Sequence, residues 1–191
     1  MRKGILAAVT LGAALLDSPS ILAQSGSQAG APLYMPGINY DLPAVLVSTA
    51  DIERTRKEME AKKQSDVPIR MVDCGGEEGG HQVGVSVVSR TRGQKSSPAV
   101  HDQVSEVYHI LEGAGTVVVG GKVTNAKRRP FTEWNGPGIT GDAVEGGVRT
   151  RLAKGDVLII PAGTPHWFTS VDESLFYTVV RVDASKITPL K

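Results

Sequence analysis

The chain has 191 residues, of which 40% are hydrophobic, and its 21 basic and 20 acidic residues nearly balance. This length allows one domain with a sizeable hydrophobic core. The near-neutral charge, without a basic stripe, gives no support for nucleic-acid binding. The only cysteine is Cys74, which excludes an intramolecular disulfide.

Residues 1–23 have the pattern of a secretory signal peptide. Arg2 and Lys3 precede an uncharged apolar segment, residues 5–16, and Ala23 supplies a small residue for cleavage. The apolar segment is too short to cross a bilayer well, and no second segment of transmembrane length follows. We therefore expect cleavage after Ala23 and a periplasmic or secreted protein without an integral membrane span.

The next two segments precede the main domain. Residues 24–43 are rich in Gly, Ser, Pro and Ala without a period, which predicts a flexible arm. Residues 44–66 predict a short strand at 44–47 followed by a surface helix. Ser48 and Asp51 have the spacing of a helix-capping pair, and the acidic residues of this segment precede its lysines, as the helix dipole favours.

From residue 67 to 185 the pattern changes to short β-type segments separated by Gly and Pro, which predicts an all-β sandwich or barrel. The expected strands are 69–72, 83–89, 106–111, 116–119, 157–160 and 176–182. Residues 125–147 are polar and Gly-rich, and form a loop that is either a functional lid or an insertion without function. Residues 186–191 form a C-terminal tail.

Three side chains have a spacing that suits a metal site. His101 and Glu106 flank a predicted turn between two strands, and His166 follows a Pro- and Gly-containing turn at the start of another strand. Any one of them alone is more often a structural residue. Two imidazoles and one carboxylate that converge from different strands suit Fe, Mn, Zn or Ni as a divalent ion, and leave positions open for substrate.

Two motifs around these residues resemble those of the cupin superfamily. The first motif has glycines at both ends, and the second has a Pro, a Gly and a His at the family's spacing. The matching positions are Gly93, His101, Glu106 and Gly113 in the first motif, and Gly155, Pro161, Gly163 and His166 in the second. The resemblance implies a single cupin β-barrel, of jelly-roll or double-stranded β-helix type, with one divalent transition metal in its mouth and commonly a homodimer.

The first motif departs from the family at Ala99, where the family has its first histidine, and Ser170 replaces the asparagine of the second motif. The positions that match the family's motifs therefore imply three metal ligands, His101, Glu106 and His166. One interpretation is a three-ligand site with an extra position free for substrate. The other is a site too weak to hold metal, in a domain that binds a small ligand instead. Gln103 and His81 are candidates to replace the missing ligand.

Two aromatic residues share faces with these ligands. Tyr108 lies on the same side of its strand as Glu106, so it is a candidate acid or hydrogen-bond donor, or else a core residue. Phe168 is expected to line the pocket, whereas His109 should face the opposite side.

The resulting hypothesis is a metal-dependent enzyme of dioxygenase, isomerase or lyase type that acts on a small organic substrate. The alternative is a non-catalytic cupin that binds a small ligand.

Overall fold

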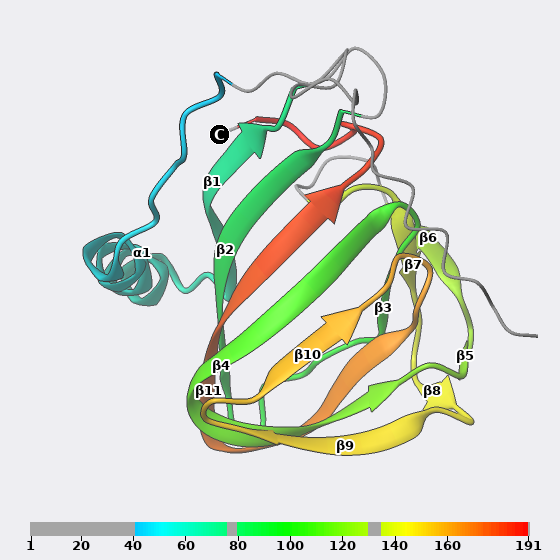
Figure 1. Cartoon of the computed structure of the whole chain (residues 1–191). Coiled ribbons are helices and arrows are strands. Elements are labelled where there is room, and N and C mark those ends of the chain that lie inside the picture. The colour runs from blue at the N-terminus through cyan, green and yellow to red at the C-terminus, as the bar shows by residue number, and fades with distance from the viewer. Residues whose placement is uncertain (1–40, 76–79, 130–134, 191) are drawn as a thin grey trace, which may run out of the picture. The chain divides into compact units, whose positions relative to one another are not determined.

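The computed structural model describes residues 41–75, 80–129 and 135–190, which belong to one compact unit, Met35–Lys191. Within these residues the regular structure is mostly β-strand, with one helix, as the sequence predicted (Figure 1). The predicted signal peptide and most of the predicted arm lie outside the described residues, so they stay predictions. No helix of the described part is long and apolar enough to span a bilayer.

The helix α1, Thr49–Lys62, begins where the capping pair predicted. The Ser48 amide donates to an Asp51 carboxylate oxygen at 3.0 Å, and the Asp51 amide donates to Ser48 Oγ at 3.2 Å. This satisfies two of the amides that a helix leaves unpaired at its start. The strand predicted at 44–47 is wrong, because these residues pair with no neighbouring strand and instead lead into the helix cap.

One nine-stranded sheet organises the rest of the described chain, and β5 and β8 form a separate two-stranded ladder. The main path runs β1-β2-β11-β3-β7-β6, and β4 pairs with β9, β10 and β11. The strands are β1 (Asp66–Asp73), β2 (Gln82–Thr91), β3 (Ala99–His101), β4 (Val104–Val119), β5 (Lys122–Val123), β6 (Lys127–Arg129), β7 (Gly138–Thr140), β8 (Val144–Glu145), β9 (Val148–Ala153), β10 (Val157–Ile160) and β11 (His166–Asp183).

The antiparallel pair β4 and β11 connects the two sides of the fold. The strands predicted at 106–111 and 116–119 are one strand, β4, which continues through Gly113. β11 pairs with β4 along most of its length, with three irregularities in register that bend the pair. The first half of β11 also contacts β3, and its second half pairs with β2. The same two strands therefore contribute side chains to both sides of the sheet.

The apolar core lies on the inner face of this folded sheet. It comprises Val88, Tyr108, Ile110, Val117, Leu152, Ile160, Phe168, Leu175, Tyr177 and Val179. A smaller cluster on the outer face packs Met59 of α1 against Val87 and Phe176. The alternation of inward and outward residues along β2, β4 and β11 produces these two clusters.

The segment 125–147 is not a simple loop. It contains β6, β7 and β8, and β7 pairs with β3 from Ala99↔Thr140 to His101↔Gly138. Residues 138–140 are therefore part of the main sheet. The expected tail is also partly packed, because Thr188 is buried and its amide donates to the Asp183 carboxylate at 2.7 Å.

Gly113 and Gly93 are both motif glycines with a positive φ, of 77° and 75°, but their surroundings differ. A Cβ on Gly113 would lie 1.9 Å from the Ser174 carbonyl oxygen, whereas a Cβ on Gly93 would meet nothing within 4 Å. We predict that G93A costs about 1 kcal/mol of unfolding free energy, from backbone strain alone. G113A should cost about 3 kcal/mol or more, because β11 must also move.

Urea denaturation of both variants measures this difference. Equal losses in the two variants would show that the close approach of β4 and β11 at Gly113 is not what requires a glycine there.

Candidate metal centre

Three strand ends bring the predicted ligands together. His101 is the last residue of β3, Glu106 lies near the start of β4, and His166 is the first residue of β11. The β11–β3 pair aligns His166 with Ala99, two residues before His101. All three side chains are buried, with exposed fractions of 4%, 1% and 6% in chain order. The site therefore forms inside the fold rather than on its surface.

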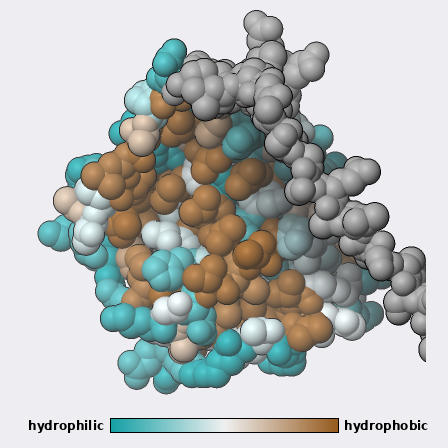
Figure 2. Space-filling view, viewed as in Figure 1, coloured by the Kyte–Doolittle hydropathy of each residue, from teal (hydrophilic) through white to brown (hydrophobic). Residues whose placement is uncertain are grey.

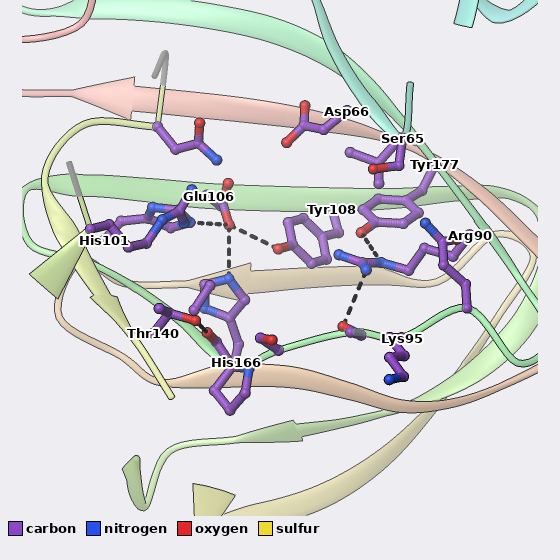
Figure 3. Close-up of a pocket in the computed structure, with 18 of the residues that line it drawn as sticks. Ser65, Asp66, Arg90, Lys95, His101, Glu106, Tyr108, Thr140, His166 and Tyr177 are labelled. Carbon is purple, nitrogen blue, oxygen red and sulfur yellow. Dashed lines mark hydrogen bonds and ion pairs between the residues drawn. The ribbon is translucent and has the colours of Figure 1, made fainter. Parts of the chain in front are cut away.

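The ligand atoms of the three residues converge on one point (Figure 3). His101 Nε2 lies 3.5 Å and His166 Nε2 lies 3.4 Å from Glu106 Oε2. All three atoms lie within 4.8 Å of one another. A tetrahedral ion with bonds of about 2.1 Å would separate its ligand atoms by about 3.4 Å. The observed separations are of that size.

The protonation of these groups favours a cation between them. Burial lowers the pKa of His101 to about 4 and also lowers the pKa of His166, so both imidazoles are neutral at pH 7. His166 Nδ1 lies 3.1 Å from the Thr164 carbonyl oxygen, which can only accept, so its Nε2 carries a lone pair. That lone pair faces an ionised carboxylate. The contact is repulsive unless a cation lies between the two atoms.

Two further observations agree with a metal. The ring of His101 turns Nε2 toward the Glu106 carboxylate, while Nδ1 is buried and has no hydrogen-bond partner among the described residues. Imidazole nitrogens and a carboxylate oxygen are the donor set that Fe, Mn, Zn and Ni accept. The residues present therefore fit a divalent transition metal.

Arg181 holds the ligand carboxylate in place, and the sequence analysis missed it. Its Nε donates to Glu106 Oε1 at 2.9 Å, its Nη1 to Ser86 Oγ at 2.6 Å, and its Nη2 to Asp66 Oδ2 at 2.7 Å. Burial raises the pKa of Glu106, but the charge of Arg181, the two neighbouring imidazoles and the Tyr108 hydrogen bond together outweigh it, and the pKa falls to about 2. Glu106 is thus ionised and ready to bind a cation.

Tyr108 completes the surroundings of Glu106. Its hydroxyl donates to Glu106 Oε2 at 2.8 Å, and the residue is part of the apolar core, as one of the two interpretations predicted; its role as an acid or donor toward substrate stays a prediction. Burial, followed by the negative charge of Glu106, raises the pKa of Tyr108 well above its ordinary value. With Arg181 on Oε1 and Tyr108 on Oε2, the oxygen that faces the imidazoles, Oε2, has one lone pair left for a metal.

The other predicted site residues lie in different places. Ala99 lines the cavity beside the three ligands. Gln103 is exposed and, like His81, is not among the described residues that line this cavity, so neither replaces the missing histidine. Phe168 does not line this cavity either. It packs in the core against Tyr108, with ring centroids 6.3 Å apart, and borders a smaller neighbouring pocket. His109 is exposed on the opposite face, as predicted.

A cavity of about 610 Å³ opens onto the three ligands. This is the size of pockets that hold small organic molecules. Besides the ligands, its described lining includes Arg90, Lys95, Tyr108, Asn135 and Tyr177. Asn135 and Thr140 come from the segment 125–147, so this segment supplies part of the cavity wall.

Comparison with protein families finds the cupin family over residues 77–190. Among solved structures, a protein from Bacillus halodurans is 16% identical, with 74% of this chain and 83% of that chain covered and a TM-score of 0.44. A cupin protein from Bacteroides fragilis is 18% identical, with 57% and 72% covered and a TM-score of 0.36.

The oxalate decarboxylase of Lactobacillus farciminis is 16% identical, with 53% of this chain and 24% of that chain covered and a TM-score of 0.37. At these identities the solved structures are similar in fold alone. A search of curated proteins found no match.

Replacing Arg181 with Met should cost about 3–5 kcal/mol of unfolding free energy, because it leaves Glu106 as a buried charge without its cation. R151M is the matched control, because Arg151 forms an exposed ion pair with Asp172 at 2.6 Å and should cost less than about 1 kcal/mol. Denaturation in the presence of a chelator measures both variants without a metal contribution.

Adding E106Q to R181M should restore part of the loss, since the buried charge is then removed. If R181M and R151M are equally stable, Arg181 does not provide the support that its contacts indicate.

Proposed function

This chain belongs to the cupin family, and we propose that it is an enzyme that uses one divalent transition metal to act on a small organic molecule. The observation that carries the proposal is the convergence of two neutral imidazoles on an ionised carboxylate at 3.4 and 3.5 Å. The cavity beside them has room for a substrate.

His101, Glu106 and His166 would hold the ion, through the two Nε2 atoms and one oxygen of Glu106. Glu106 Oε2 is the oxygen that faces both imidazoles, while Oε1 accepts a hydrogen bond from Arg181. When bound, the ion supplies Lewis acidity toward a substrate oxygen. Ala99 has no donor atom and lines the cavity, so the side of the site where the family has a histidine is left for the substrate.

Tyr108 would act as a fixed hydrogen-bond donor. Its raised pKa keeps the hydroxyl protonated at neutral pH, and its proton is directed at Glu106 Oε2. The hydroxyl therefore orients the carboxylate and limits its charge on the cavity side. This is a positioning role, and it differs from that of a residue that removes a proton from substrate.

The second candidate function is non-catalytic binding of a small ligand. Ala99 favours it, because a site with three protein ligands binds metal less tightly than one with four. The two candidates differ in a measurable way, since only the enzyme requires the ion.

We predict that protein purified without an affinity tag contains about one equivalent of Fe, Mn, Zn or Ni, measured by plasma mass spectrometry. H166A should contain almost none, because two ligands cannot replace the three-residue site. The variant should keep its far-UV circular dichroism, because the sheet does not depend on the imidazole.

H109A is the matched control, since His109 is exposed and points away from the cavity. Full metal content in H166A would contradict the ligand assignment. Metal-free wild-type protein, even after incubation with each ion, would favour the ligand-binding alternative.

We propose further that the chain forms a homodimer through the outer face of the sheet. Ile159 is 67% exposed, and it begins a row of apolar residues across four strands. Register aligns Ile159 with Val107, Val107 with Val180, and Val180 with Val85. Figure 2 shows apolar residues gathered over β2, β11, β4 and β10. A second copy of this face would cover these apolar residues, with the exposed Arg70, which aligns with Val85, at the end of the row.

I159K should convert the dimer to a monomer, because it places a charge within the apolar contact, at the most exposed residue of the row. Light scattering coupled to size-exclusion chromatography measures the mass. L190K, at a residue 57% exposed near the C-terminus, is the control and should leave the mass unchanged. A monomeric wild-type protein would contradict the proposal.

A further inference from the structure

Arg90 lies beside the candidate metal centre, and no acidic side chain of the described residues forms an ion pair with it. Its Nε donates to the Tyr177 hydroxyl at 3.0 Å and its Nη1 to Ser96 Oγ at 3.3 Å. Three of the five N–H groups of a guanidinium therefore have no partner in the described part of the chain. The guanidinium also lies over the Phe168 ring, 4.9 Å from its centroid, which fixes its plane.

Other arginines of the described chain differ from Arg90 in this respect. Arg56, Arg128, Arg151 and Arg181 each donate to both oxygens of a carboxylate or to two carboxylates. Arg90 is only partly exposed, so its charge is incompletely hydrated and a bound anion would stabilise it. Its position and its free N–H groups suit a carboxylate.

Arg90 and the metal centre line the same cavity. Figure 3 shows Glu106 and Arg90 on either side of Tyr108, with Tyr177 beside the guanidinium. The Tyr108 and Tyr177 rings lie 4.9 Å apart and form the wall between the two positions. A ligand of a few carbon atoms lying along this wall would reach both Arg90 and the three metal ligands.

The charge of the cavity also favours an anion. Five cationic side chains of the described residues line it, namely Lys63, Arg90, Lys95, Arg129 and Arg181. Only two anionic side chains, Asp66 and Glu106, do so, and Arg181 pairs with both. A bound divalent ion would add further positive charge. The field in the cavity therefore attracts acids.

We propose that the substrate is a small organic acid, whose carboxylate pairs with Arg90 while a second oxygen-bearing group reaches His101, Glu106 and His166. The proposal rests on the proposed function, because it defines the substrate class of the same site. A neutral molecule of the same shape would leave the Arg90 charge without a counter-ion and would bind more weakly.

Isothermal titration of zinc-loaded full-length protein with malonate, succinate, glutarate and adipate tests the proposal, at constant ionic strength. The series varies the distance between carboxylates, and dimethyl succinate is the uncharged control. We expect at least one diacid to bind and the diester not to bind. R90Q should weaken that binding about ten- to hundred-fold, as expected for a lost charged hydrogen bond.

Two further variants separate binding from structure. R90K keeps the charge but loses the planar pair of donors, so its affinity should lie between those of R90Q and the wild type. R149Q is the matched control, because Arg149 donates to Thr169 on the exposed surface and does not line the cavity. A thermal melt of R90Q shows whether the variant remains folded.

The metal content of each variant distinguishes this proposal from the proposed function. R90Q should keep the zinc of the wild type. Three results would each overturn the acid assignment and leave the metal centre intact. In the first, the zinc-loaded protein binds none of the diacids. In the second, R90Q binds them as tightly as the wild type does, and in the third, R149Q loses as much affinity for them as R90Q does. If the wild type holds no metal, the proposed function fails. The difference in succinate affinity between R90Q and the wild type then still decides the role of Arg90.

Discussion

The buried ion pair between Arg181 and Glu106 is the interaction on which the site depends. Two charges that are almost fully removed from water are costly unless every donor and acceptor is used. Here Arg181 contacts Glu106, Ser86 and Asp66 at once, and Tyr108 contacts the remaining side of the carboxylate. This network keeps Glu106 ionised and holds it where two imidazoles can share a cation with it.

The same strand register builds both the network and the fold. β11 places Arg181 opposite Glu106 of β4 and Gly84 of β2, while its first residue is His166. A shift of one residue between β4 and β11 would turn either Glu106 and Tyr108 of β4 or Arg181 of β11 toward the outer face, and would break their contact. The close contact at Gly113 opposes such a shift, because the Ser174 backbone leaves no room there for a residue with a side chain. Strand pairing and ligand geometry are therefore not independent.

The balance of charge separates two parts of the cavity. At the metal centre, Arg181 is neutralised by carboxylates, so the imidazoles face an ionised oxygen. At the other end, the hydrogen-bond partners of Arg90 in the described part of the chain are neutral, a tyrosine and a serine. The first arrangement attracts a cation and the second an anion. A substrate that is an acid and also offers oxygen to a metal would match both parts.

Local spacing explains what was predicted correctly. The capping pair of α1 and the β-rich domain depend on neighbours a few residues apart, and these were predicted from sequence. The spacing within two motifs also grouped His101, Glu106 and His166, which the structure brings together. The strand at 44–47 was wrong because a short apolar segment does not reveal whether a partner strand is available. The segment 125–147 was described as a loop because its strands are too short to show a period.

The sequence by itself determined the fold family and the three candidate ligands, because motif residues lie within turns and strand ends that set local geometry. Only the tertiary structure decided which arginine supports the carboxylate, which arginine is left without an acidic partner, and where Phe168 packs. Arg181 is 75 residues from Glu106, and Arg90 is 87 residues from Tyr177. Contacts over such separations follow from strand register and burial, which no local pattern encodes.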